Sequence, residues 1–179
     1  MDKLGNLILY IAEQCQADES FGATKLNKIL FLTDFLAYGV WGKPITGATY
    51  MRIAHGPVPR ELMPIQGELI DSGRAVMQIR NCFGYEQKRL IALDEPDLRQ
   101  FTQDEIELVD QVIQASCGVT ASAFSDWTHT LLPWLLAEDK EVIPFHTIFT
   151  LKKEPVGTDD LKWGLSTLQD LQATGAIEC

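Results

Sequence analysis

The side chains best suited to chemistry lie in one short stretch, Ser125-Asp126-Trp127-Thr128-His129. A serine, a histidine and an acid are the groups of a hydrolase in which a nucleophile contacts a base and the base contacts an orienting carboxylate. On a helix, Ser125 lies four residues from His129 and Asp126 lies three residues from it, so the three side chains can meet. The same spacing fits an ordinary polar cluster on a helix, and we favour that interpretation over catalysis.

Other polar groups are explained without catalysis or metal binding. Asp104-Glu105 and Asp159-Asp160 stand at expected helix starts, where the helix dipole stabilises acids. The histidines at 55, 129 and 146 share no ligand spacing, and the four cysteines contain no Cys-x-x-Cys pair. We therefore expect reduced, structural cysteines and no catalytic, metal or cofactor site.

A small group of cations could contact nucleic acid. Lys25 and Lys28 stand near an expected helix start, and Arg52 and Arg60 flank the stretch His55-Gly56-Pro57. A surface that binds nucleic acid usually gathers more cations than these four. We favour a solvated face, and DNA binding stays open as the second possibility.

Apolar spacing predicts two helices in the first forty residues. Over residues 4–15 the apolar positions recur every three or four residues, which indicates an amphipathic surface helix. Over residues 24–40 they cover most of the circumference, which is typical of a helix at the centre of its domain. Glycines and a proline over 39–47 end this second helix.

A short strand, a helix and a hairpin are expected next. Residues 48–53 favour a strand, the prolines over 57–59 suit the start of a helix over 62–70, and Gly73 suits its end. Residues 75–79 and 88–93 predict two strands of a hairpin. A helix followed by a hairpin is the last part of a winged-helix arrangement.

The second half of the chain is predicted to be mostly helical. Thr102 and Glu105 form a capping box for a helix that ends at Gly118. Another short helix over 120–131 is expected to stop at Pro133, with residues 134–153 mostly loop. A last helix over 158–175 carries a leucine stripe at positions 161, 165, 168 and 171. The fold class is therefore mainly α with a small β component, a compact helical domain containing a winged-helix-like helix–hairpin unit.

Acidic residues are concentrated in the second half of this 179-residue chain. Residues 1–90 hold 10 basic and 9 acidic side chains, whereas residues 91–179 hold 5 and 16, which together give the net charge of −10. This balance argues against a protein that coats nucleic acid, and it favours a basic partner. No transmembrane run or signal peptide is evident, so we expect a cytoplasmic protein that does not contact a membrane.

The order of several short motifs resembles a known family. A helix with Lys25-Leu26-Asn27-Lys28-Ile29-Leu30 comes first, followed by Gly42-Lys43-Pro44, then Gly56-Pro57-Val58, then Ser125 to His129, and finally Pro133-Trp134. This order resembles the Panacea domain, the SocA-like antitoxin family of bacterial and phage toxin–antitoxin systems. The resemblance covers roughly residues 4 to 150, and we assign residues 1–153 to this domain and 154–179 to a C-terminal helix packed on it.

The resemblance implies an antitoxin that neutralises a cognate protein toxin by direct binding, without enzymatic activity. Gly56-Pro57-Val58 would then fix a tight helix start beside the Tyr50 strand, and His129 with Trp134 would pack against the helix that holds Lys25 and Asp34. These motif residues could contact the partner or could only determine the fold. The residues singled out are Lys25, Lys28, Asp34, Tyr50, Arg52, His55, Gly56, Pro57, Val58, Asp126, His129 and Trp134.

Two other functions stay open beside the antitoxin hypothesis. A winged-helix-like regulator that binds DNA, including its own promoter, would use the helix–hairpin unit. A hydrolase would use Ser125 and His129, and we rank it last.

Overall fold

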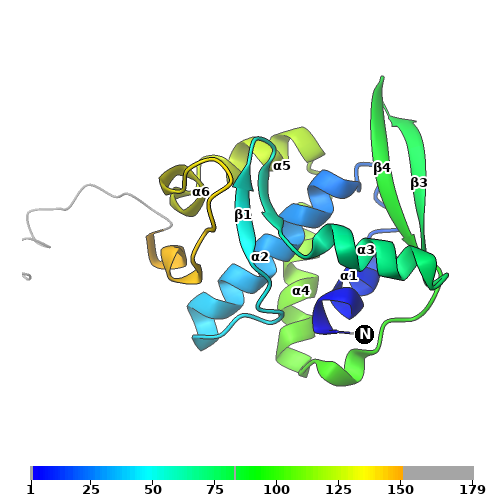
Figure 1. Cartoon of the computed structure of the whole chain (residues 1–179), viewed down its shortest axis with the longest axis horizontal. Helices are drawn as coiled ribbons and strands as arrows, with labels where there is room; N and C mark the ends of the chain where they lie inside the picture. The colour runs from blue at the N-terminus through cyan, green and yellow to red at the C-terminus, as the bar shows by residue number, and fades with distance from the viewer. Residues whose placement is uncertain (1, 83, 151–179) are drawn as a thin grey trace, which may run out of the picture.

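The computed structural model describes residues 2–82 and 84–150. This part of the chain forms six α-helices, two 3-10 helices and two antiparallel sheets of two strands each (Figure 1). The predicted fold class, mainly α with a small β component, is confirmed. The predicted helix over 158–175, with its Asp159-Asp160 cap, lies outside the described residues, as does Cys179.

The central element is α2 (Ala23–Trp41), as its dense apolar pattern predicts. It contacts α1, α4, α5, β2, β4 and η2, and Figure 1 shows it running through the middle of the molecule. The helix ends at Gly42, which has φ of 69° and donates its N–H to the Tyr38 carbonyl at 2.8 Å. Glycine adopts this left-handed conformation without the steric cost of a side chain.

Helix α1 (Lys3–Gln14) forms as predicted, but it is not a surface helix. Residues 4 to 12 are all buried, because α1 lies against α2, α3, α4 and β4. Asn6 interrupts the apolar pattern, yet it is 1% exposed. Its amide oxygen accepts from the Asp97 N–H at 2.8 Å, so a distant segment covers the face that the sequence assigned to solvent.

The stretch after His55 is a strand, which corrects the predicted helix start. β1 (Tyr50–Ile53) pairs antiparallel with β2 (Gly56–Pro59), with Arg52 opposite Pro57 and Tyr50 opposite Pro59. The backbones of Arg52 and Tyr50 bond to residues 140–143 on the other edge of β1. Positions opposite them need donate nothing to β1, so prolines fit there.

A helix and a hairpin follow, as predicted. α3 (Leu62–Asp71) ends before Gly73, whose φ is 72°, and β3 (Ala75–Cys82) pairs with β4 (Tyr85–Ala92). The strands are longer and the connecting loop is shorter than expected. Figure 1 places this hairpin at the opposite end of the molecule from α6.

The acidic half forms the remaining helices. They are η1 (Leu98–Gln100), α4 (Gln103–Ser116), α5 (Ala121–Thr128), α6 (Leu132–Leu136) and η2 (Phe145–Thr150). The capping box of Thr102 and Glu105 is confirmed. Pro133 begins α6 instead of stopping α5, because proline is tolerated in the first turn of a helix. None of the helices in the described part is long and apolar enough to cross a lipid bilayer.

Candidate partner-binding site

The predicted site residues fall into separate groups in the structure. Half of them meet, together with Ser125, where α2, the β1–β2 turn, α5 and α6 come together. We call this group the Gly56 junction, and it consists of Lys28, Arg52, His55, Gly56, Ser125, His129 and Trp134. Asp34 and Tyr50 form a second cluster, Lys25 belongs to a third, and Pro57 and Val58 lie in β2, with Pro57 buried and Val58 half-buried.

The Gly56 junction is built around the ammonium group of Lys28. Lys28 lies in the first half of α2, is 0% exposed, and donates to the backbone carbonyl of His55. Gly56 has φ of 105°, and a Cβ there would overlap the Lys28 ammonium and lie 2.8 Å from its Cε atom. Only a glycine therefore lets the chain pass this close to the buried lysine.

An aromatic stack closes the junction on the α5 and α6 side. The His129 and Trp134 rings stack with their centroids 4.2 Å apart, and the Arg52 guanidinium lies 4.0 Å from the Trp134 ring centroid. Burial lowers the pKa of His129, the charges of Lys28 and Arg52 lower it further, and that of Asp126 opposes them. His129 is therefore held in its neutral form, which suits a ring packed beside two cations.

The Ser125 hydroxyl contacts a backbone carbonyl, and Asp126 lies at the surface. The Ser125 hydroxyl donates to the His55 carbonyl at 3.2 Å, the same oxygen that accepts from Lys28. In hydrolysis a nucleophilic hydroxyl donates to its base, whereas the contact found here is to a backbone acceptor. Asp126 is exposed and acts on His129 only through its charge. The polar-cluster interpretation describes this geometry.

Asp34 and Tyr50 fasten the connection after α2 to the helix. Asp34 is 0% exposed and accepts from the Thr46 N–H at 2.7 Å and from the Thr46 hydroxyl. The Tyr50 hydroxyl lies 2.9 Å from Asp34 Oδ2 and 2.8 Å from the Leu30 carbonyl. Burial raises the pKa of Asp34, whereas its hydrogen bonds lower it, and the net direction is upward. Both side chains lie inside the core, and this burial fits a role in the fold.

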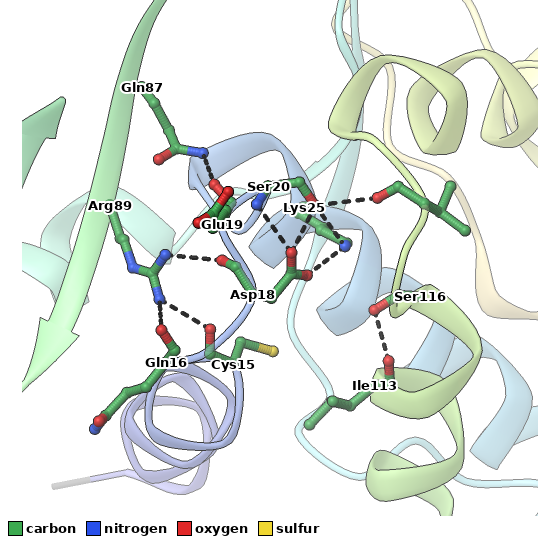
Figure 2. Close-up of polar contacts among 11 residues, drawn as sticks. Cys15, Gln16, Asp18, Glu19, Ser20, Lys25, Gln87, Arg89, Ile113 and Ser116 are labelled. Atoms are coloured by element: carbon green, nitrogen blue, oxygen red, sulfur yellow. Dashed lines mark hydrogen bonds and ion pairs between the residues drawn. The ribbon is translucent and has the colours of Figure 1, made fainter. Parts of the chain in front are cut away.

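Lys25 belongs to a joint between α1 and α2 (Figure 2). Its ammonium is 0% exposed, forms an ion pair with Asp18, and donates to Ser20 Oγ at 2.9 Å. Arg89 on β4 donates to three carbonyls of the same loop, at 2.9 Å to Cys15, 2.5 Å to Gln16 and 2.8 Å to Asp18. One buried polar network thus ties the hairpin to both helices.

The predicted basic patch does not exist as a surface. Lys25 and Lys28 are 0% exposed, Arg52 is half-buried and covers Trp134, and only Arg60 is exposed. The two lysines satisfy their ammonium groups inside the domain, so neither a solvated face nor a DNA footprint describes them. Lysine and arginine side chains are rarely buried, so the residue types alone suggest that Lys25 and Lys28 lie at the surface.

Sequence reasoning missed an apolar pocket of about 1020 Å³. It is lined from several elements, among them Phe35 of α2, Val112 of α4, Trp127 of α5, Leu135 of α6 and Ile148 of η2. Trp127 and Leu135 are 48% and 49% exposed, so the pocket opens to solvent. The signal in the sequence is the excess of large apolar residues over 127–136, a stretch that the local pattern divides between a short helix and a loop.

The first prediction compares two glycines with positive φ. Gly56→Ala should lower the free energy of unfolding well beyond Gly73→Ala, because the new methyl group meets Lys28 at position 56 and nothing within 4 Å at position 73. The left-handed backbone alone costs about 1–2 kcal/mol. Urea unfolding of both variants measures the difference. Equal losses would contradict the close packing of Gly56 on Lys28.

The second prediction concerns pH. Burial lowers the pKa of Lys28 from 10.5 to about 8. Between these values the unfolded chain binds more protons than the folded one, so Lys28 makes the free energy of unfolding rise with pH across this window. The measured quantity is the free energy of unfolding of the wild type minus that of Lys28→Met. Between about pH 8 and pH 10.5 this difference should rise, by at most about 1.4 kcal/mol per pH unit.

Urea unfolding of both proteins below and above pH 8 measures this difference. Taking the difference removes the opposing titrations of Tyr10 and Cys15, whose pKa values burial raises and which both proteins share. The exposed Lys88→Met controls for the loss of one ammonium group. A difference that stays constant with pH would show that Lys28 is not a buried cation.

The comparisons with known proteins agree with the order of motifs. No curated protein and no solved structure matches the chain. A family model described as "Antitoxin SocA-like, Panacea domain" matches residues 26–135, which is more than half of the chain and spans α2 to α6. The Lys28 helix, the Gly56 turn, His129 and Trp134 all lie within this match, and the chain therefore belongs to the SocA-like antitoxin family with a Panacea domain.

Proposed function

We propose that this protein neutralises a cognate protein toxin by binding it directly, without catalysis. The family match over residues 26–135 is the observation that carries this proposal, since membership of an antitoxin family implies a toxin partner. The Gly56 junction supports the absence of catalysis, because the Ser125 hydroxyl is bonded to the His55 carbonyl.

The charge of the second half supports a toxin with a basic surface. Between residues 91 and 150 the sequence holds only Arg99 and Lys140 as lysines or arginines. The exposed acids there are Asp94, Glu95, Asp104, Glu107, Asp110, Asp126, Glu138, Asp139 and Glu141. Complementary potentials of this kind speed and orient association.

DNA binding remains the second candidate, on the strength of the helix–hairpin unit alone. In a winged-helix protein the helix before the hairpin approaches the phosphates. Here α3 carries Glu68 and Asp71 and neither lysine nor arginine, which disfavours that contact. The positive charges that could support DNA binding are the exposed Arg60 before α3 and the exposed Arg80 and Lys88 on the hairpin.

The third prediction tests neutralisation. Expression of the neighbouring open reading frame should stop growth, and co-expression of this protein should restore it through a complex that co-purifies. Gly56→Ala, which places a methyl group against the end of the buried Lys28 side chain, should rescue less well than Gly73→Ala. A harmless neighbour, or toxicity that wild-type protein does not relieve, would refute the proposal.

The fourth prediction concerns association kinetics with that toxin. Raised salt should slow association far more than dissociation, because screening weakens long-range attraction. Replacing the exposed pair Glu138→Gln and Asp139→Asn should lower the association rate. The matched pair Glu68→Gln and Asp71→Asn on α3 changes the charge equally and should have a smaller effect. Surface plasmon resonance at several salt concentrations measures both rates, and a salt-independent association rate would show that the acidic half does not steer binding.

A further inference from the structure

The apolar pocket between α2, α4, α5, α6 and η2 has no occupant among the described residues. Its volume of about 1020 Å³ lies at the upper end of the usual range for ligand sites, and its lining is mostly apolar. Trp127 and Leu135 leave about half of their surface exposed at its rim. Covering the apolar side chains of this pocket would be favourable, because it removes them from water.

The chain itself supplies a segment of matching chemistry. Residues 158–175 carry leucines at 161, 165, 168 and 171, a spacing that places them on one face of a helix. Thr158, Asp159 and Asp160 provide the N-terminal cap and favourable charges for that helix. An amphipathic helix of this kind needs an apolar surface against which to bury its stripe.

The point at which this segment is attached favours the same pocket. Ile148 of η2 lines the pocket, and the chain continues from η2 toward residue 158. The seven connecting residues, 151–157, can span at most roughly 25 Å, and a helix over 158–175 is about 27 Å long. A segment tethered this close has a high effective concentration at the pocket, so it binds ahead of a separate partner of equal intrinsic affinity.

Charge favours the same pocket less strongly than the leucine stripe and the tether do. Glu138, Asp139 and Glu141 are exposed directly after α6, which contacts η2. Lys152 and Lys153 at the start of the connection can attract these acids. Over residues 151–162, however, Glu154, Asp159 and Asp160 balance the three lysines, so the segment carries no net positive charge there.

We propose that residues 158–175 dock as a helix in the apolar pocket of their own chain, with the leucine stripe facing Val112, Trp127 and Leu135. This inference concerns the free protein and does not depend on the identity of a toxin. The segment completes the core of the domain at the surface that α2, α4, α5 and α6 leave open.

Photo-crosslinking in the full-length protein tests the docking directly. Leu168→p-benzoylphenylalanine places a crosslinker on the stripe, and Ser166→p-benzoylphenylalanine places one on the opposite face of the same helix. The proposal requires crosslinks from position 168 to peptides of α4, α5 or α6 within the monomer band, identified by mass spectrometry. A crosslinker at position 166 should not form crosslinks to these three helices.

Two neighbouring leucines on α6 provide the pocket-side control. Leu135 lines the pocket and is 49% exposed, whereas Leu136 does not line it and is 64% exposed. With the crosslinker at 168, Leu135→Asp should abolish the crosslinks to the pocket and Leu136→Asp should keep them. Circular dichroism checks that both variants remain folded, which their exposure favours.

Several outcomes would overturn the proposal. Crosslinks that join two chains would assign the pocket to a second copy, and crosslinks to the hairpin or to α3 would place the segment elsewhere. Equal crosslinking in Leu135→Asp and Leu136→Asp would separate the segment from the pocket. Rescue from toxicity is measured independently, so failure of the docking proposal and failure of toxin neutralisation are distinguishable.

Discussion

The arrangement of the domain depends on one buried cation, the ammonium group of Lys28. Removing an ammonium from water costs several kcal/mol unless hydrogen bonds replace the lost solvation. Here the replacement is the His55 carbonyl, which reaches the lysine only because Gly56 has no side chain. The same carbonyl accepts from Ser125 of α5, so α2, the β1–β2 turn and α5 are joined at a single oxygen atom. The orientation of the elements that form the surface follows from this inner contact, with Trp134 and His129 closing it.

The family motif is therefore mostly an interior feature. Lys25, Lys28, Asp34, Tyr50 and Gly56 are all buried. Lys25 is bonded to the nearby loop before α2, and the other four are bonded to, or packed against, residues more than ten positions away in sequence. These residues of the motif therefore face inward in this chain. This arrangement supports the view that the motif determines the fold and that residues outside it contact the partner.

Local patterns predicted most of the helices and the hairpin, and long-range contacts account for the errors. The Thr102 capping box and the Gly73 terminator involve neighbours in sequence, so their types and spacing are sufficient. Asn6 and Lys28 read as solvent-facing because their partners, Asp97 and His55, are distant along the chain. Pro57 suggests a helix start in the sequence, because a proline cannot donate a backbone hydrogen bond to a neighbouring strand. The structure shows that Arg52, opposite Pro57, bonds to residues 140–143 on the other edge of β1, so a strand tolerates the proline there. The junction residues were recognised through the family resemblance, whereas the apolar pocket needs several elements in place before it exists.

The double pairing of β1 has a consequence for how the chain is made. One edge of β1 pairs with β2, which follows within a few residues in the sequence. The other edge pairs with residues 140–143, which are synthesised much later. A nascent chain that has not yet reached these residues therefore presents an open strand edge, the kind of surface that pairs with other chains. Folding during synthesis would leave this edge uncovered until the last described segment emerges, so a truncated product would be selectively prone to self-association.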